Sequence, residues 1–362
     1  HLDLIQPDGS TTDLSPGPWD LTEFVGADSR GRFAWYEAAR PNPLERRLFR
    51  VDLKSGDTIE LTAEPGSHTG QLSPAHDRQL VRATSFELPV RWTVLDCQGG
   101  AAVVVPDDDH RPRVQLAERR VVTITADDCL ELAAMLLLPQ GLSEEKRYAV
   151  VVYTFGGAHA QVVRNTWPGS SGLFNHYLTT RGFVVFALDN RGSAARGRDF
   201  EGATDLALGS KQLPDQLAGV RWLAEQPWVK PDRIAIWGWS YGGYMTAYAL
   251  THAPGTFAAG AAVAPVTDWA LYDSIYTERY MDSPANNPGG YADSSVLNAV
   301  DNLDDPLLVI HATGDDNVHL QHSLQLADRA WRGGVDFDLK LFPNLTHGIR
   351  APGARLQVFG AV

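Results

Sequence analysis

The feature that constrains this chain most is a Gly-x-Ser-x-Gly turn at residues 238–242, with Ser240 at its centre. A short apolar run, residues 234–237, precedes the turn, and a stretch of small and apolar residues follows it to Leu250. A strand, such a turn and then a helix form the context of a nucleophile elbow, whose glycines let strand and helix approach closely. The elbow would raise the Ser240 hydroxyl above the strand ends and aim the Tyr241 amide at a developing oxyanion.

A serine nucleophile needs a base, and the base needs an acid that orients it. In folds that use this elbow, the acid and then the histidine follow the serine along the chain. An apolar strand is predicted at residues 307–311, ahead of Asp315, and an alternating strand at residues 337–341, ahead of His347. Taken singly, Asp315 would be a turn carboxylate and His347 a surface histidine. Because both follow strand ends, where ligands of open α/β sheets bind, we predict that they form a catalytic triad with Ser240.

The pattern from about residue 120 onward predicts a mostly parallel sheet. Residues 148–153 and 182–188 are continuous apolar runs, which are typical of parallel strands buried on both faces. Residues 214–224 have the apolar spacing of an amphipathic helix. Strands that alternate with helices predict an α/β fold with helices on both faces of the sheet.

The pattern from about residue 19 to residue 105 is all-β. A hairpin is predicted around Ser55-Gly56, and the repeated strand–turn rhythm predicts propeller blades of about four short strands each. About two blades fit, whereas a closed propeller needs roughly 4–8. We therefore expect a β-propeller remnant at 1–110 and a catalytic domain at 111–362. The predicted strands are residues 32–36, 47–53, 58–62, 72–74, 79–84 and 90–95.

The expected boundary is the charged, proline-bracketed segment 106–113. Its Asp and His residues could be drawn as a metal site, but a solvated linker explains them better. Because the chain begins at His1 in mid-pattern, we expect it to be part of a longer protein.

Composition narrows the class of protein further. The 362 residues carry a formal net charge of -13, which argues against nucleic acid or an anionic membrane surface as a partner. No apolar run reaches the roughly 18 residues of a membrane span. The two cysteines, Cys97 and Cys129, make no disulfide framework. They favour the cytoplasm slightly over a periplasm or secretion, and the compartment stays open.

Four segments resemble the prolyl oligopeptidase family of serine peptidases, on its dipeptidyl peptidase IV branch. The resemblance is strong from about Arg120 to Gly348 and weaker before that. It implies an α/β-hydrolase fold preceded by a β-propeller. The segments are residues 189–193 (Asp-Asn-Arg-Gly-Ser), 237–244 around the elbow, 272–280 (Tyr-Asp-Ser-Ile-Tyr-Thr-Glu-Arg-Tyr) and 315–319 (Asp-Asp-Asn-Val-His), of which 272–280 discriminates best, because ordinary esterases have no reason to carry it.

The same resemblance implies an apolar S1 pocket and a P2 contact. Asn317 would bind the P2 carbonyl of the substrate. Aromatic faces suit proline, which is compact, apolar and needs no donor. The alternative is an ordinary apolar helix, because 269, 272 and 276 lie at helical spacing. The residues that would wall the pocket are Tyr241, Val266, Trp269, Tyr272 and Tyr276.

Two departures from the family pattern bear on activity. Family aminopeptidases hold the substrate's amino group with a Glu pair from the propeller, whereas the adjacent glutamates here, Glu144 and Glu145, belong to the hydrolase part. Relatives also carry a tyrosine, the second oxyanion donor, where this chain has Phe155. Tyr153, two residues earlier, is a second candidate for that donor.

The leading hypothesis is a serine exopeptidase that releases N-terminal dipeptides with proline or alanine at the penultimate position. One alternative is an acylaminoacyl- or oligopeptidase-like enzyme or an esterase. Another is a catalytically weak binding or assembly domain. We expect a peptide substrate and no metal or organic cofactor, since the triad loop and its following helix explain His311, His319 and His322 better than a metal site does. A homodimer is left open.

Overall fold

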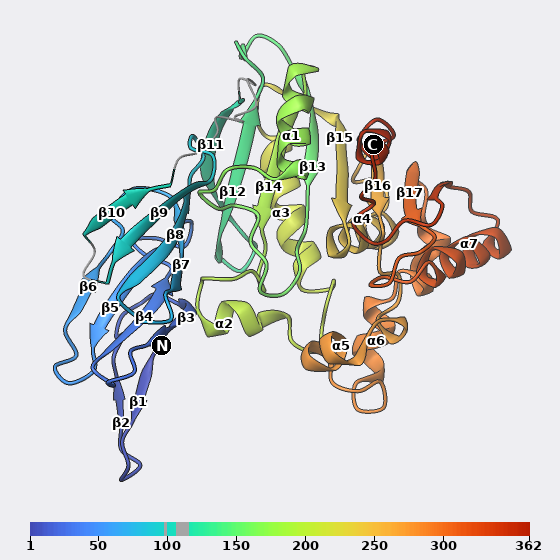
Figure 1. The fold of residues 1–362 in the computed structure, drawn as a ribbon. Helices are drawn as coiled ribbons and strands as arrows, with labels where there is room; N and C mark the ends of the chain where they lie inside the picture. Colours follow the sequence, from blue (N-terminus) through green and yellow to red (C-terminus); the bar gives the residue numbers. More distant parts are fainter. Residues whose placement is uncertain (98–99, 106–115) are drawn as a thin grey trace. The chain divides into compact units, whose positions relative to one another are not determined.

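The computed structural model describes residues 1–97, 100–105 and 116–362 (Figure 1). The chain forms two compact units. The first comprises His1–Gln115 together with Arg164–Ser170 and Ala194–Arg198, and the second comprises Leu116–Val163, Ser171–Ser193 and Asp199–Val362. The predicted linker, residues 106–113, and the predicted boundary between residues 110 and 111 lie outside the described residues.

The first unit contains two antiparallel four-stranded sheets, each with its strands in chain order. This up-and-down arrangement is that of a propeller blade, so the all-β segment has the expected form. A short hairpin precedes them. The strands are β1 (Asp3–Ile5) and β2 (Thr11–Asp13) in the hairpin, β3 (Leu21–Ala27), β4 (Phe33–Ala38), β5 (Arg47–Asp52) and β6 (Thr58–Glu60) in one blade, and β7 (Ser67–Leu72), β8 (Arg78–Thr84), β9 (Arg91–Asp96) and β10 (Ala101–Val104) in the other.

The β5–β6 hairpin turns at Ser55-Gly56 as predicted. Gly56 has a φ of +77°, a conformation that a side chain disfavours, and Asp52 Oδ1 accepts hydrogen bonds from the amides of Lys54 and Ser55. The strand expected at residues 72–74 was misplaced, because β7 ends at Leu72. Its residues are mostly polar, and the pairing with β8 along all six of them supplies what the local pattern lacks.

The second unit is built on an eight-stranded sheet with the order β11-β12-β14-β13-β15-β16-β17-β18 (Figure 1). β11 and β12 pair antiparallel, as do β12 and β14, and the other pairs are parallel. The central strands are continuously apolar because both of their faces are covered. The strands are β11 (Glu118–Thr125), β12 (Glu131–Leu138), β13 (Tyr148–Tyr153), β14 (Val184–Asp189), β15 (Val229–Trp239), β16 (Ala259–Val263), β17 (Leu307–Ala312) and β18 (Asp338–Phe342).

Helices cover both faces of this sheet. The helices α3 (Gln212–Ala224), α4 (Tyr241–His252) and α7 (Gln321–Gly333) pack on one face. On the other face lie α1 (Ser170–Thr180) and α8 (Ala354–Phe359), whose rings Phe174 and Phe359 stack at 4.6 Å. The remaining helices are α2 (Arg198–Glu201), α5 (Ser274–Met281), α6 (Pro288–Ser294) and the 3₁₀ turns η1 (Gly202–Thr204), η2 (Trp269–Leu271) and η3 (Leu297–Asn302).

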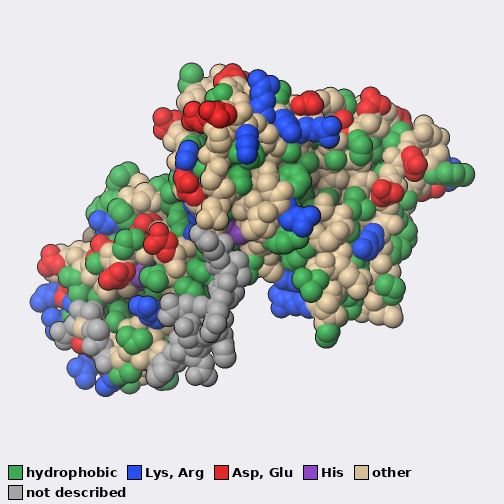
Figure 2. Space-filling view, turned by 90° about the horizontal axis from the view of Figure 1, so that it is seen from above, with side chains coloured by type: hydrophobic (Ala, Val, Ile, Leu, Met, Phe, Trp, Pro, Cys, Tyr) green, Lys and Arg blue, Asp and Glu red, His purple; other side chains and the backbone are tan. Residues whose placement is uncertain are grey.

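Strand order and layering make the second unit an α/β-hydrolase fold, as expected. The described residues contain no helix that is both long and apolar enough to cross a membrane. Acidic and basic side chains are interspersed on the face that Figure 2 presents. That face therefore carries no broad field of a single sign.

Candidate active site

Ser240 lies on a sharp turn between β15 and α4. Its φ of 60° and ψ of -117° are strained for a residue with a side chain. A Cβ at Gly238 would overlap the backbone of Gly242 and the carbonyl oxygen of Thr154, so only glycine allows the strand and helix to cross this closely. The Ser240 amide donates to the carbonyl oxygen of Val263 on the neighbouring strand at 2.8 Å. The turn therefore has the geometry of a nucleophile elbow.

Asp315 and His347 lie beyond the carboxyl ends of β17 and β18. His347 Nδ1 is 2.8 Å from Asp315 Oδ2. The other oxygen, Asp315 Oδ1, accepts from the amides of Asn317 and Val318 at 3.0 and 2.9 Å. The Asp315 side chain is fully buried, whereas that of His347 is 20% exposed and so remains accessible. A buried carboxylate thus holds a histidine ring that remains accessible.

Backbone contacts tie the loops of Asp315 and His347 to each other and to the elbow. The Gly314 amide donates to the Leu345 carbonyl at 3.0 Å. The indole Nε1 of Trp239, the residue before Ser240, donates to the carbonyl oxygen of His347 at 3.1 Å. These bonds hold the three strand ends in one place without relying on the side chains that would react.

The Asp315 carboxyl is held ionised. Burial by itself raises its pKa, but the hydrogen bonds from His311 and His347 and the bond from the Asn317 amide outweigh burial and hold the pKa well below its usual range. The carboxylate therefore keeps its charge across the range in which a histidine titrates.

The elbow places the Tyr241 amide at the start of a helix. Tyr241 is the first residue of α4, and the first amides of a helix have no acceptor within the helix. The backbone of Phe155 lies against Gly242, and its ring stacks on that of Tyr241 at a centroid distance of 6.2 Å. Position 155, where the family resemblance implies a tyrosine hydroxyl, thus lies beside the elbow but carries only a phenyl ring.

The structure places the ring of Tyr153, the other candidate for the second donor, away from the elbow. Its ring packs on Trp237 at 5.0 Å, in the apolar cluster that α1 and α8 cover. Phe155 and Tyr241 belong to the cluster on the opposite face of the sheet. Tyr153 lies on the same face of β13 as Val151. Because β13 ends at Tyr153, Phe155 is outside the strand's alternation and its ring turns to the elbow side.

The predicted pocket residues form an aromatic wall. Trp269 lies 5.3 Å from Tyr241, 5.8 Å from Tyr272 and 5.9 Å from Tyr276, measured between ring centroids. Val266 is buried in the same cluster. The alternative of one continuous apolar helix is wrong, because η2 ends at Leu271, Tyr272 is extended and α5 starts at Ser274. The break lets Tyr272 and Tyr276 meet edge to face at 5.7 Å.

Asn317 joins this wall to the loop of Asp315. The Tyr272 hydroxyl donates to Asn317 Oδ1 at 2.5 Å, so the amide nitrogen of Asn317 is its side-chain donor for a ligand. A cavity of about 350 Å³ lies here and is lined by Leu271, Tyr272, Asp273, Asp316, Asn317 and His319.

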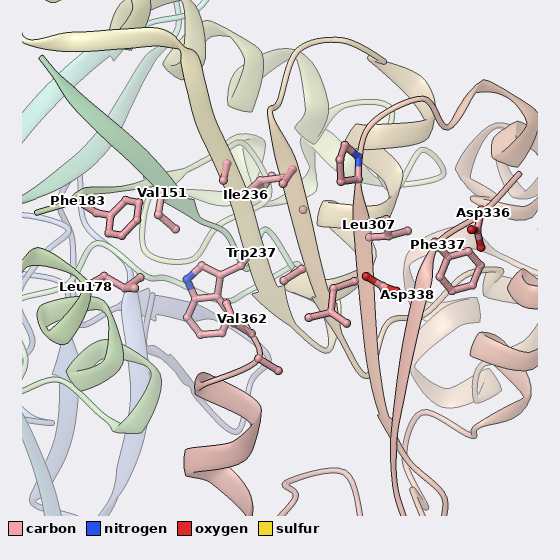
Figure 3. A pocket seen from close by; sticks show the side chains of 17 residues that line it. Val151, Leu178, Phe183, Ile236, Trp237, Leu307, Asp336, Phe337, Asp338 and Val362 are labelled. Atoms are coloured by element: carbon pink, nitrogen blue, oxygen red, sulfur yellow. The ribbon is translucent and has the colours of Figure 1, made fainter. Parts of the chain in front are cut away.

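A larger apolar cavity of about 500 Å³ lies elsewhere, on the sheet face that α1 and α8 cover. Val151, Trp237 and Val362 point into it (Figure 3). No predicted site residue lines it, so volume alone does not locate the chemistry in this unit. Within the described part of the chain, no group of three or more His, Cys, Asp or Glu side chains gathers as a metal site would need.

Several polar groups that support the site were not predicted from the sequence. Gln212 Nε2 donates to the Tyr241 hydroxyl at 2.7 Å and to the Gly156 carbonyl at 3.3 Å. Asp189, in the quoted 189–193 motif, accepts from the amides of Val162 and Val163 and so holds the far end of the Phe155 loop. Of these groups, only Asp189 could have been found from the sequence, because it is a carboxylate at the end of a strand.

Fold and site together define an α/β-hydrolase with a serine elbow and an Asp–His pair. The model of the prolyl oligopeptidase family matches residues 171–361, and that of the dipeptidyl peptidase IV N-terminal region matches residues 1–90. The chain belongs to the prolyl oligopeptidase family.

Similar proteins agree with this assignment. A "Probable dipeptidyl-aminopeptidase B" of Coccidioides posadasii is 32% identical over 99% of this chain, and a "Probable dipeptidyl peptidase 4" of Emericella nidulans is 31% identical over 99%. The crystal structure of Porphyromonas gingivalis dipeptidyl peptidase 4 superposes on the whole chain with a TM-score of 0.94 at 30% identity. The chain spans 40% and 48% of the two relatives and 52% of the solved chain.

Proposed function

We propose that this chain carries the catalytic machinery of a serine peptidase that releases N-terminal dipeptides, with proline or alanine at the penultimate position. The observation that carries the proposal is the 2.8 Å hydrogen bond between His347 and Asp315 on the strand ends next to the elbow. The similarity to dipeptidyl peptidases over nearly the whole chain supports the reaction class.

In the proposed reaction, Ser240 Oγ attacks the scissile carbonyl carbon and its proton passes to His347 Nε2. The Tyr241 amide donates to the oxygen that becomes negative. His347 then gives the proton to the leaving amine as the C–N bond breaks. A water molecule repeats the sequence on the acyl-enzyme and frees the dipeptide acid. Asp315 accepts from His347 Nδ1 throughout and stabilises the imidazolium.

Substrate comparison tests the proposal. The expected result is faster turnover of a Gly-Pro arylamide than of an acetyl-Ala arylamide or a short acyl ester. Preference for acetyl-Ala would favour an acylaminoacyl-peptidase, and preference for the ester would favour an esterase. A second candidate, a catalytically weak assembly domain, is favoured by Phe155, which removes an oxyanion donor. Absence of labelling by a fluorophosphonate would favour that candidate.

Tyr272 and Tyr276 are expected to set the preference for proline. Replacing either with Ala should cost roughly 1–3 kcal/mol of discrimination against bulkier P1 residues, which is the scale for groups lost from a hydrophobic pocket. The measurement is kcat/KM on Gly-Pro and Gly-Leu arylamides. Ile275→Ala is the matched control, because Ile275 is next to Tyr276 on α5 but 88% exposed. Equal losses on both substrates would mark the tyrosines as supports of the fold instead.

A further inference from the structure

A second histidine faces the carboxylate of the Asp–His pair. His311 is on β17, four residues before Asp315, and its side chain is fully buried. Its Nε2 lies 2.8 Å from the carbonyl oxygen of Val318 and 3.3 Å from Asp315 Oδ2. Its Nδ1 lies 2.7 Å from the hydroxyl of Ser323 on α7. Both ring nitrogens therefore have protein partners.

These partners determine where the hydrogen on His311 is. A carbonyl oxygen can only accept, so Nε2 must carry a hydrogen. In the neutral ring Nδ1 then accepts from the Ser323 hydroxyl. Nε2–H is directed to Val318 O at 2.8 Å, and Asp315 Oδ2, 3.3 Å from Nε2, is its longer second partner. Asp315 Oδ2 thus lies between two imidazoles, those of His311 and His347.

The two oxygens of Asp315 are held differently. Oδ1 has two backbone amides as donors, while Oδ2 has His347 on the accessible side and His311 on the buried side. A second donor at Oδ2 fixes the plane of the carboxylate and withdraws part of its charge from His347.

We propose that His311 is a positioning residue that, through Nε2–H, orients the Asp315 carboxylate and limits the negative charge that it presents to His347. This inference rests on the proposed function, because it concerns the same Ser240–His347–Asp315 machinery. From their spacing alone, His311 and Asp315 could be drawn as a pair of metal ligands. Because both ring nitrogens of His311 already have protein partners, we assign it a positioning role instead.

The titratable groups around His311 come from three elements. Asp315 follows β17, His347 follows β18, and His322 is on α7 with His319 just before it. Burial chiefly, and then His311 and His319, lower the pKa of His322 to about 4, so His322 is neutral wherever a serine peptidase works. Its Nδ1 accepts from the Thr267 amide at 3.1 Å. The titratable groups that remain beside His311 are therefore Asp315, which stays ionised, and His347.

The test compares His311→Asn with His311→Gln in the full 362-residue chain. The amide of Gln reaches the place of Nε2, whereas the amide of Asn reaches only that of Nδ1. With the donor lost, more charge on Oδ2 stabilises the His347 imidazolium. The acid limb of the pH profile, for kcat/KM and for the rate of fluorophosphonate labelling, should then move to higher pH in His311→Asn. It should stay near the wild-type position in His311→Gln.

The same loss should lower kcat roughly 10- to 100-fold in His311→Asn, by analogy with the scale seen when the hydrogen-bond partners of metal-binding side chains are removed. KM should stay within a few-fold, because His311 does not reach substrate. If His311→Asn does not fold, Ser323→Ala, which frees the ring at Nδ1, should show a smaller shift in the same direction.

Two failures are distinguishable. A wild-type chain that neither hydrolyses arylamides nor reacts with the fluorophosphonate overturns the proposed function. A reactive wild-type chain whose acid limb and kcat are unchanged in a folded His311→Asn variant overturns the role of His311 alone. So does a shift of equal size in His311→Gln, because that would reflect the loss of the imidazole and not of its donor.

Discussion

Ser240→Ala is expected to abolish fluorophosphonate labelling and to lower kcat on an activated dipeptide substrate by a factor on the order of 10⁶. His347→Ala should cost about as much, because triad members act as a unit and losing either removes the same pathway. The measurements are covalent labelling followed by mass spectrometry and steady-state hydrolysis of Gly-Pro arylamide. Labelling that persists in Ser240→Ala would show that the elbow is misidentified.

The acid of the pair allows a matched control. Asp315→Asn should lower kcat by roughly 10⁴-fold, because an amide cannot hold the His347 ring in the required tautomer. Asp316→Asn changes the adjacent carboxylate in the same way, but Asp316 is exposed and forms no part of the pair. It should leave kcat within a few-fold. Because Asp316 lines the cavity beside Asn317, any effect of this control is expected in KM. Similar losses in both variants would indicate damage to the loop and not to the triad.

Phe155→Tyr is expected to make the enzyme faster. An acyl-transfer oxyanion is best stabilised by two donors in a site without water, and the Tyr241 amide supplies one. A hydroxyl at position 155, beside Gly242 and the Tyr241 ring, would supply the other. Losing one such donor typically costs 10²–10³-fold in kcat, about 2.7–4 kcal/mol, so we expect a gain up to that size. KM should stay within a few-fold, because the donor acts in the transition state.

Tyr153→Phe is the control for this gain. Tyr153 packs against Trp237 in the cluster on the other face of the sheet, so removing its hydroxyl should leave kcat unchanged. No gain from Phe155→Tyr together with a ~10²-fold loss from Tyr153→Phe would mean that Tyr153 supplies the donor after all. That result would contradict the assignment of the two side chains to opposite faces.

Much of the fold could be predicted because its signals are local. The strands β13 and β17 are uninterrupted apolar runs, and the β5–β6 hairpin has its glycine at the position with positive φ. Both patterns depend on neighbours in the chain. β7 was misplaced for the opposite reason: its polar residues are stabilised by pairing with β8, and that pairing leaves no apolar alternation to detect.

The aromatic wall shows where local spacing misleads. Trp269, Tyr272 and Tyr276 have helical spacing, but the Asp268 and Asp273 side chains each accept from an amide two or three residues on, and so start two separate turns. Short polar side chains compete with a continuing helix in this way. The wall depends on that break, which spacing cannot reveal.

The sequence by itself determined which residues to propose as nucleophile, acid and base. The glycines around Ser240 permit one strained crossing, and the predicted strand ends indicate where Asp315 and His347 lie. Only the tertiary structure decided which groups surround them. In the folded chain, Tyr153 lies on the opposite face of the sheet and the Phe155 ring lies beside the elbow. His311 lies on the buried side of Asp315. The reason is physical: a residue's chain neighbours govern its turn or strand, whereas the partners of a buried polar atom come from segments that meet only when the sheet assembles.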